Sequence, residues 1–83
     1  MTNLQNLAED VRFEAARLAK NLTLLGCEGQ VKLHERTLVE LIELDALYGD
    51  GGRDVRATAR VATQHKLNIA KAAVALRTTK EAK

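Results

Sequence analysis

The residues with the clearest potential for phosphate chemistry surround a glycine cluster in the middle of the chain. The segment LYGDGGRDVR, residues 47–56, holds three of the five glycines and runs into arginines. A Walker phosphate loop needs a lysine and a hydroxyl at G-x-x-x-x-G-K-[ST] spacing after a strand, and a calcium loop needs twelve residues with a terminal Glu. This segment meets neither pattern. It predicts a bend in which Gly49 ends one helix and Asp50 or Asp54 caps the next.

Four basic residues share one side of the helix expected after this bend, and we call them the basic stripe: Arg53, Arg56, Arg60 and Lys71. Positive charge in the first turn of a helix opposes the helix dipole by roughly 0.3–1 kcal/mol per exposed charge, so we expect compensation. If the preceding helix packs antiparallel, its acids Glu40, Glu43 and Asp45 lie within reach as surface ion pairs. The other interpretation is that the stripe binds an acidic protein surface or the phosphate backbone of a nucleic acid.

The cysteine and histidine residues do not predict a metal site or a catalytic centre. Cys27 is the only cysteine, His65 has no second His, Cys or carboxylate three or four residues later, and His34 lacks an H-x-x-x-H partner. Catalysis also needs a concave pocket with convergent polar groups, for which a helical bundle of this length has little room. We therefore expect no enzyme activity, no catalytic, cofactor-binding or metal-binding residues, and no cofactor.

Length and composition indicate one small helical domain spanning residues 1–83. Hydrophobic residues make up 46% of the 83 positions, mostly Leu, Val, Ile and Ala, and aromatic residues only 2%. A chain this short buries a small share of its surface, so we expect its stability to be marginal or shared with a partner. The single cysteine favours a reducing compartment, and no apolar run approaches the roughly 18 residues of a membrane span. We expect a cytoplasmic protein without membrane contact.

Three apolar patterns with helical period predict an all-α fold, a three-helix up-down-up antiparallel bundle. The helices are expected at about residues 3–25, 31–48 and 53–80. The turn GCEGQ, residues 26–30, would separate the first two. The second helix is apolar almost all round and should therefore contact more than one neighbour. The apolar positions of the first and third helices are Leu4, Val11, Leu18 and Leu25, and Val55, Ala59, Ala62, Ile69, Ala73 and Leu76.

The second expected helix carries two polar residues within its apolar arc. The order His34, Leu38, Leu41, Asp45 is symmetric about its centre. Two antiparallel copies would therefore oppose Leu38 to Leu41, and His34 to Asp45, across a twofold axis. Polar pairs of this kind can set the register of a dimer. We expect the protein to homodimerise through this helix; the alternative is that His34 and Asp45 lie near the helix ends and reach water.

A lone aromatic side chain marks the outer side of the first expected helix. Phe13 lies opposite the apolar positions of that helix, beside Arg17 and Lys20. An outward aromatic residue next to bases is typical of an anchor for a protein partner. The alternative is that another helix or a second subunit covers Phe13.

The opening MTNLQNLAEDVRFEAARLAKNLTLL resembles the first helix of the plasmid repressor-of-primer hairpins. The resemblance implies dimerisation as a four-helix bundle and binding of RNA loops through an outward Phe and basic residues. It covers one helix, and the long third helix and the glycine turn depart from it. We therefore assign no residue role from this resemblance.

Together, these patterns predict a noncatalytic protein-protein interaction module. It would be a small helical regulator or inhibitor, of the kind common among phage and bacterial accessory proteins, that docks a helical face on a larger protein. Its partner-binding residues are expected in the basic stripe and around Phe13. The alternative is a nucleic-acid-binding regulator that uses the basic stripe. The net charge of only +2 and a turn longer than helix-turn-helix links argue against that alternative.

Overall fold

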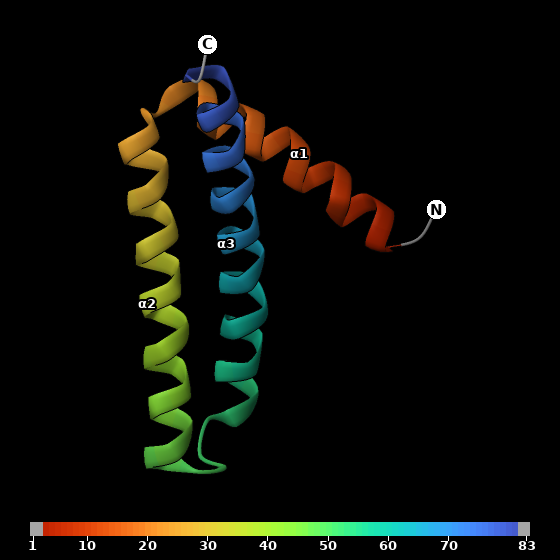
Figure 1. Cartoon of the computed structure of the whole chain (residues 1–83). Helices are drawn as coiled ribbons and strands as arrows, with labels where there is room; N and C mark the ends of the chain where they lie inside the picture. The colour runs from red at the N-terminus through yellow and green to blue at the C-terminus, as the bar shows by residue number, and fades with distance from the viewer. Residues whose placement is uncertain (1–2, 82–83) are drawn as a thin grey trace.

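Three α-helices make up the chain in the computed structural model, which describes residues 3–81 and the side chains of residues 8–79. Helix α1 spans Asn3–Asn21, α2 spans Leu24–Tyr48 and α3 spans Arg53–Glu81 (Figure 1). No strand occurs among the described residues. The predicted all-α fold with three helices is therefore confirmed.

The junction between α1 and α2 lies earlier than the sequence pattern predicted. α1 ends at Asn21, and Thr23 caps α2 by accepting a hydrogen bond from the Gly26 N–H at 3.0 Å. The predicted turn at residues 26–30 is wrong, because these residues form the first turns of α2. The Thr23 hydroxyl sets the start of α2, and Gly26 and Gly29 lie inside this helix. Leu25, predicted to end the first helix, belongs to α2.

The bend between α2 and α3 has the predicted glycine geometry. Gly49, with φ 61°, is the C-terminal cap of α2, and its N–H donates to the Asp45 carbonyl at 2.9 Å. Gly52, with φ 74°, lies immediately before α3. Both positive φ values fall in a region where glycine is favoured over residues that carry a side chain. The chain reverses here, so α3 runs antiparallel to α2.

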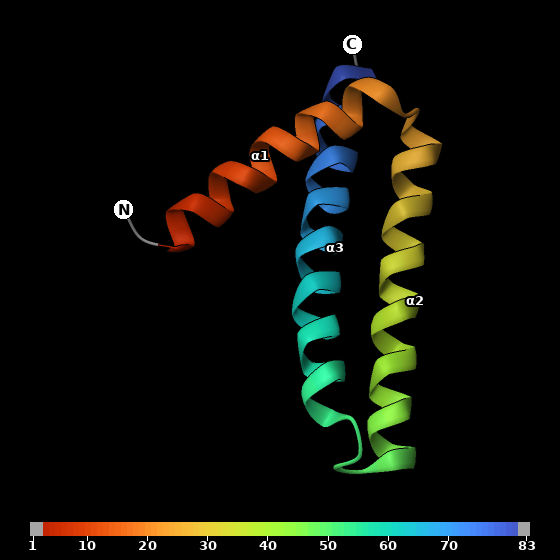
Figure 2. The same cartoon turned by 180° about the vertical axis from the view of Figure 1, so that it is seen from behind.

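α2 and α3 form a long antiparallel hairpin, and α1 leaves it at an oblique angle (Figures 1 and 2). α1 packs mainly on α3, close to the end of the hairpin that is distant from the glycine bend. The sequence pattern predicted three helices packed side by side along their lengths. In the structure the N-terminal end of α1 lies apart from the hairpin.

Small side chains dominate the core. A central cluster forms where the three helices meet, from Ala15 and Ala19 of α1, Cys27 of α2 and Ala73 of α3. Partly buried residues packed around this cluster are Leu18, Leu22, Ile69, Ala72 and Val74. Alanine side chains remove little apolar area from water, so this core contributes less stability than one built from leucine and phenylalanine.

The buried face of α3 differs from the predicted one. Thr63, Leu67 and Ala70 are buried, whereas Val55 and Leu76, which the pattern placed on the apolar face, are exposed. α3 has one neighbour, α2, along most of its length and another, α1, on a different side. A single apolar stripe therefore does not describe its contacts.

The molecule is flat, with dimensions of 49 × 34 × 15 Å along its principal axes. The C-terminal part of α1 crosses α3, and it lies behind α3 in the front view and in front of α3 in the back view (Figures 1 and 2). Near this crossing α1 covers one face of α3. The rest of the α2–α3 hairpin has no described helix packed on that face.

Candidate functional site

A polar cluster joins α2 to α3 beside the glycine bend. The Nε–H of Arg56 on α3 donates to Oδ1 of Asp45 on α2. One turn later on α3, Nη1 of Arg60 lies 3.5 Å from Oδ2 of the same carboxylate. The Arg56 side chain is only 11% exposed. Its ion pair is therefore shielded from water more than an ordinary surface pair.

The Arg56 guanidinium also holds the bend itself. Its Nη1 donates to the Gly51 carbonyl at 2.5 Å and its Nη2 to the Gly49 carbonyl at 2.7 Å. The planar fork of arginine suits several fixed acceptors, and the last carbonyls of a helix lack partners within the helix. Arg56 thus connects the end of α2, the bend and the start of α3. We call Arg56, the Asp45 carboxylate and these two carbonyls the Arg56 clamp.

The clamp lowers the pKa of the Asp45 carboxyl below its ordinary value. The hydrogen bond from Arg56 is the largest cause of the lowering. Partial burial opposes it, and the positive charges of Arg56, Arg60 and Arg53 add to it. Asp45 is therefore a carboxylate at neutral pH, and its one negative charge is shared by Arg56 and Arg60.

The three arginines of the basic stripe are paired within the chain. Arg56 and Arg60 share Asp45, and Arg53 binds Asp50 at 3.0 Å. The predicted compensation by an acid of the preceding helix is therefore confirmed at Asp45. Asp50 belongs to the bend, so both acids that pair with the stripe lie near the same end of the hairpin.

The remaining member of the stripe lies elsewhere. Lys71 is exposed near the other end of α3, where it lines a shallow depression with Glu28 and Glu35 of α2. Glu40, which was within reach of the arginines in the sequence-based prediction, instead pairs with Arg36 of α2 at 3.5 Å. The basic stripe thus consists of a paired arginine group at the bend and a separate lysine.

The four residues predicted at a dimer interface are half-buried on the side of α2 that faces α3: His34, Leu38, Leu41 and Asp45. Asp45 has its partners, Arg56 and Arg60, within the chain. Burial lowers the pKa of His34, and the positive charge of Lys66 lowers it further. A contact between His34 and Asp45 of two copies would compete with the Arg56 clamp. Self-association stays a prediction.

The aromatic patch predicted on α1 is on the surface of the chain. Phe13 is 67% exposed. Arg17 and Lys20 are also exposed, on the following turns of the helix. Arg17 lies 3.8 Å from the half-buried Glu14 on the adjacent turn. By helical periodicity this outer side of α1 is opposite Ala15, which packs in the core.

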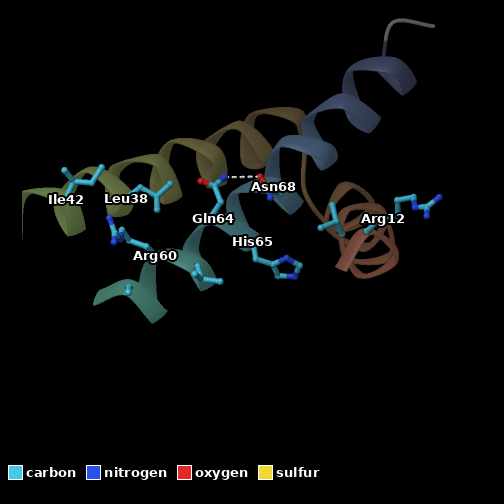
Figure 3. A pocket seen from close by; sticks show the side chains of 11 residues that line it. Arg12, Leu38, Ile42, Arg60, Gln64, His65 and Asn68 are labelled. Atoms are coloured by element: carbon cyan, nitrogen blue, oxygen red, sulfur yellow. Dashed lines mark hydrogen bonds between the residues drawn. The ribbon is translucent and has the colours of Figure 1, made fainter. Parts of the chain in front are cut away.

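An open apolar groove lies where α1 diverges from the hairpin, and the sequence did not predict it. Its volume is about 990 Å³. Figure 3 shows Leu38 and Ile42 of α2, and Arg60, Gln64 and His65 of α3, along this groove. Six apolar residues from all three helices line it, and we call them the groove face: Ala8, Val11, Leu38, Ile42, Ala57 and Val61.

Among the described residues, three basic side chains line the groove, Arg12, Arg60 and His65, and two of them contact carboxylates within the chain. His65 Nε2 lies 2.6 Å from Oδ2 of Asp10, which ties α3 to α1. Arg60 pairs with Asp45. One sequence signal for the groove was present, because Val61 is a large apolar residue outside the predicted apolar face of α3. Its significance depends on the oblique angle of α1, which the sequence pattern did not indicate.

The described residues also bear on three other kinds of feature, namely a metal site, a membrane-spanning helix and a free thiol. They contain no group of three or more His, Cys, Asp or Glu side chains that could hold a metal ion. No helix among them is long and apolar enough to cross a membrane. Cys27 is a buried free thiol in the core cluster. Comparison of the chain with protein-family models, with curated proteins and with solved structures gives no match.

Proposed function

We propose that this chain is a noncatalytic protein-protein interaction module, a small helical regulator or inhibitor that docks a helical face on a larger protein. The observation that supports this proposal is the imbalance between buried and exposed apolar residues. In the described part of the chain the buried apolar residues are four alanines, Leu67 and Cys27, whereas eleven large apolar side chains are exposed. Extensive exposed apolar surface marks interaction sites in soluble proteins.

The outer side of α1 is the surface that we propose for the larger partner. Phe13 projects there with Arg17 and Lys20 beside it. Arg17 lies 3.8 Å from the half-buried Glu14, and a pair at that distance, with the arginine exposed, holds the guanidinium weakly. Aromatic and arginine side chains dominate the energetics of many interfaces. We infer that the partner presents an apolar pocket edged by acidic residues.

We also propose that the module is a homodimer to which α2 contributes, and that it is cytoplasmic. A core of small side chains gives a single copy little stability, and burial of exposed apolar surface against a second copy would add to it. The unpaired thiol of Cys27 agrees with a reducing compartment.

Ion pairing at the bend favours a protein partner over a nucleic acid. A phosphate backbone binds through basic side chains that release counterions. In this chain Asp45 pairs with Arg56 and Arg60, and Asp50 pairs with Arg53. Two carboxylates therefore offset much of the positive charge of these three arginines before any ligand arrives.

Capture from nuclease-treated lysate of the source organism tests the proposal. The tagged wild-type chain should retain a larger protein, and Phe13→Ala and the double variant Arg17→Glu/Lys20→Glu should lose it. Val55→Ala is the matched control, since Val55 is an exposed apolar residue on another helix. Retention unaffected by Phe13→Ala would contradict the proposal. So would retention of nucleic acid alone from untreated lysate, with affinity that falls steeply as salt is added.

A further inference from the structure

We propose that a second copy of this chain packs on the groove face and covers the part of the hairpin that α1 leaves open. This inference rests on the proposed homodimer and names its surface. The groove face differs from the dimer seam predicted from the sequence, because it uses Ile42 and Val61 in place of His34 and Asp45. Leu38 belongs to both.

The shape of the molecule leaves much of the hairpin without a second layer. Stable domains consist of at least two packed layers of secondary structure around a core. This chain measures 15 Å along its shortest principal axis, and α1 packs across α3 only near one end of the hairpin. Its radius of gyration is 14.8 Å, compared with about 11.8 Å expected for a compact domain of this length.

The exposed area shows how much surface a partner would need to cover. The chain exposes 6164 Å², whereas a folded monomer of 9.1 kDa is expected to expose about 4,900 Å², an excess of roughly 1,270 Å². A standard protein interface removes about 800 Å² from each partner. One interface of ordinary size thus accounts for most of the excess area.

The groove face is the suitable side of the molecule because apolar residues of all three helices line it. Val61 is 73% exposed and Ile42 is 57% exposed, both large side chains. Ala8 and Ala57 are small, so they allow another helix to approach. A contact here would bury the apolar area that the divergence of α1 leaves open (Figure 3).

The contacts that the polar groove residues make within their own chain allow a second copy as occupant. In a twofold dimer the same surface faces itself, so charge without a counter-charge would repel. Arg60 and His65 line the groove, and each lies against a carboxylate of its own chain, Asp45 and Asp10 respectively. Arg12 also lines the groove, so the twofold arrangement must place the two Arg12 side chains at the edge of the interface, toward water. The outer side of α1 around Phe13 points elsewhere and stays available to the larger partner.

Sedimentation velocity of a matched pair of variants tests this inference. Val61→Asp introduces a short carboxylate into the groove face of each copy, whereas Val55→Asp makes the same change on the same helix, at a residue that is 75% exposed and does not line the groove. We expect wild type and Val55→Asp to sediment as dimers at micromolar concentration. Val61→Asp should raise the dimer dissociation constant by at least roughly 100-fold. A monomeric wild type, or a dimer that only Val55→Asp disrupts, would overturn the proposal.

Thiol crosslinking keeps the test decisive if Val61→Asp fails to fold. Cys27 is fully buried, so a cysteine introduced on the surface is the reactive thiol of the folded chain. A short bismaleimide should join two copies of Val61→Cys and leave Val55→Cys monomeric. Equal crosslinking of the two variants would contradict the groove dimer. It would leave partner capture through Phe13 unaffected, so failure of this inference is distinguishable from failure of the proposed function.

Discussion

Arg56 and Asp45 are eleven residues apart in the chain and meet between α3 and α2, at the point where the hairpin reverses. An arginine in the first turn of a helix is disfavoured by the helix dipole. Here the Asp45 carboxylate and the Gly49 and Gly51 carbonyls offset that effect, since the guanidinium bonds to all three. Arg56 therefore stabilises the bend and is not available as a binding residue without opening it.

Replacing Arg56 should destabilise the hairpin far more than replacing its neighbour in the basic stripe. Arg56→Met removes three hydrogen bonds from a charged donor, and the expected loss in the free energy of unfolding is about 2–3 kcal/mol. Arg53→Met breaks one exposed pair and should cost at most about 1 kcal/mol. Urea unfolding followed by circular dichroism, at one protein concentration, measures both. Equal losses of unfolding free energy in the two variants would show that the Arg56 clamp stabilises the chain no more than one exposed ion pair does.

Arg56→Lys should lower the free energy of unfolding about as much as Arg56→Met does, although lysine is usually a conservative replacement for arginine. Lysine keeps the positive charge but lacks the planar fork that reaches the carboxylate and the two carbonyls together. The same unfolding experiment provides the measurement. A lysine variant as stable as wild type would mean that charge alone, without the fork, holds the bend.

Acid should weaken the fold through Asp45. Its pKa is lowered in the folded chain, so between the folded and unfolded values the unfolded state binds more protons. The stabilisation is therefore complete above the unfolded pKa, about pH 4, and is lost as pH falls through the lower folded value. Unfolding free energies measured from pH 7 down to pH 2 should decline less steeply for Asp45→Asn than for wild type. Parallel curves would contradict this assignment.

His34 should titrate below the ordinary histidine range, and Lys66 should be part of the reason. Burial lowers the His34 pKa most, and the Lys66 charge lowers it further. The folded state therefore binds fewer protons than the unfolded state just below pH 6.5, and stability falls there as pH decreases. NMR titration should show that Lys66→Met raises the His34 pKa without restoring it fully. An unchanged pKa in that variant would show that the charge of Lys66 does not reach the imidazole.

Two glycines should respond in opposite directions to the same substitution. Gly29 lies inside α2, where a Cβ meets nothing within 4 Å, so Gly29→Ala should stabilise the chain by about 0.5–1 kcal/mol. Gly52 has φ 74°, and its Cβ would lie 3.1 Å from Nη1 of Arg56, so Gly52→Ala should destabilise it by about 1–2 kcal/mol. Thermal unfolding of the two variants compares them directly. Stabilisation by both would contradict the described geometry of the bend.

The sequence predicted best where local chemistry decides the structure. Positive φ at Gly49 and the return of α3 along α2 follow from glycine preference and chain connectivity, and antiparallel packing then brings Asp45 within reach of Arg56. The junction at Thr23 was missed because apolar residues continue at helical spacing from Leu22 to Leu25. A capping hydroxyl within such a run gives a weaker signal than the glycines that follow it.

The groove face could not be predicted from the sequence because it depends on the angle of one helix. Ala15 and Ala19 are on the buried side of α1, and the way they pack near Ala73 sets its direction. Helix crossing angles depend on how the side chains of both helices interdigitate, which hydrophobic periodicity does not specify. Val61 is apolar in the sequence, but only the divergence of α1 makes it part of a groove.

Site-specific photo-crosslinking measures the proposed docking on a larger protein most directly. A photoreactive amino acid at position 13 should join the chain to one larger protein in lysate of the source organism, and excess untagged wild type should compete that product away. The same group at position 55 should give no such product, because Val55 is equally accessible but lies outside the proposed surface. The predicted result is a crosslink to one protein that forms from position 13, does not form from position 55, and disappears when untagged wild type is in excess. No competable product from position 13, or the same product from both positions, would contradict the proposed function.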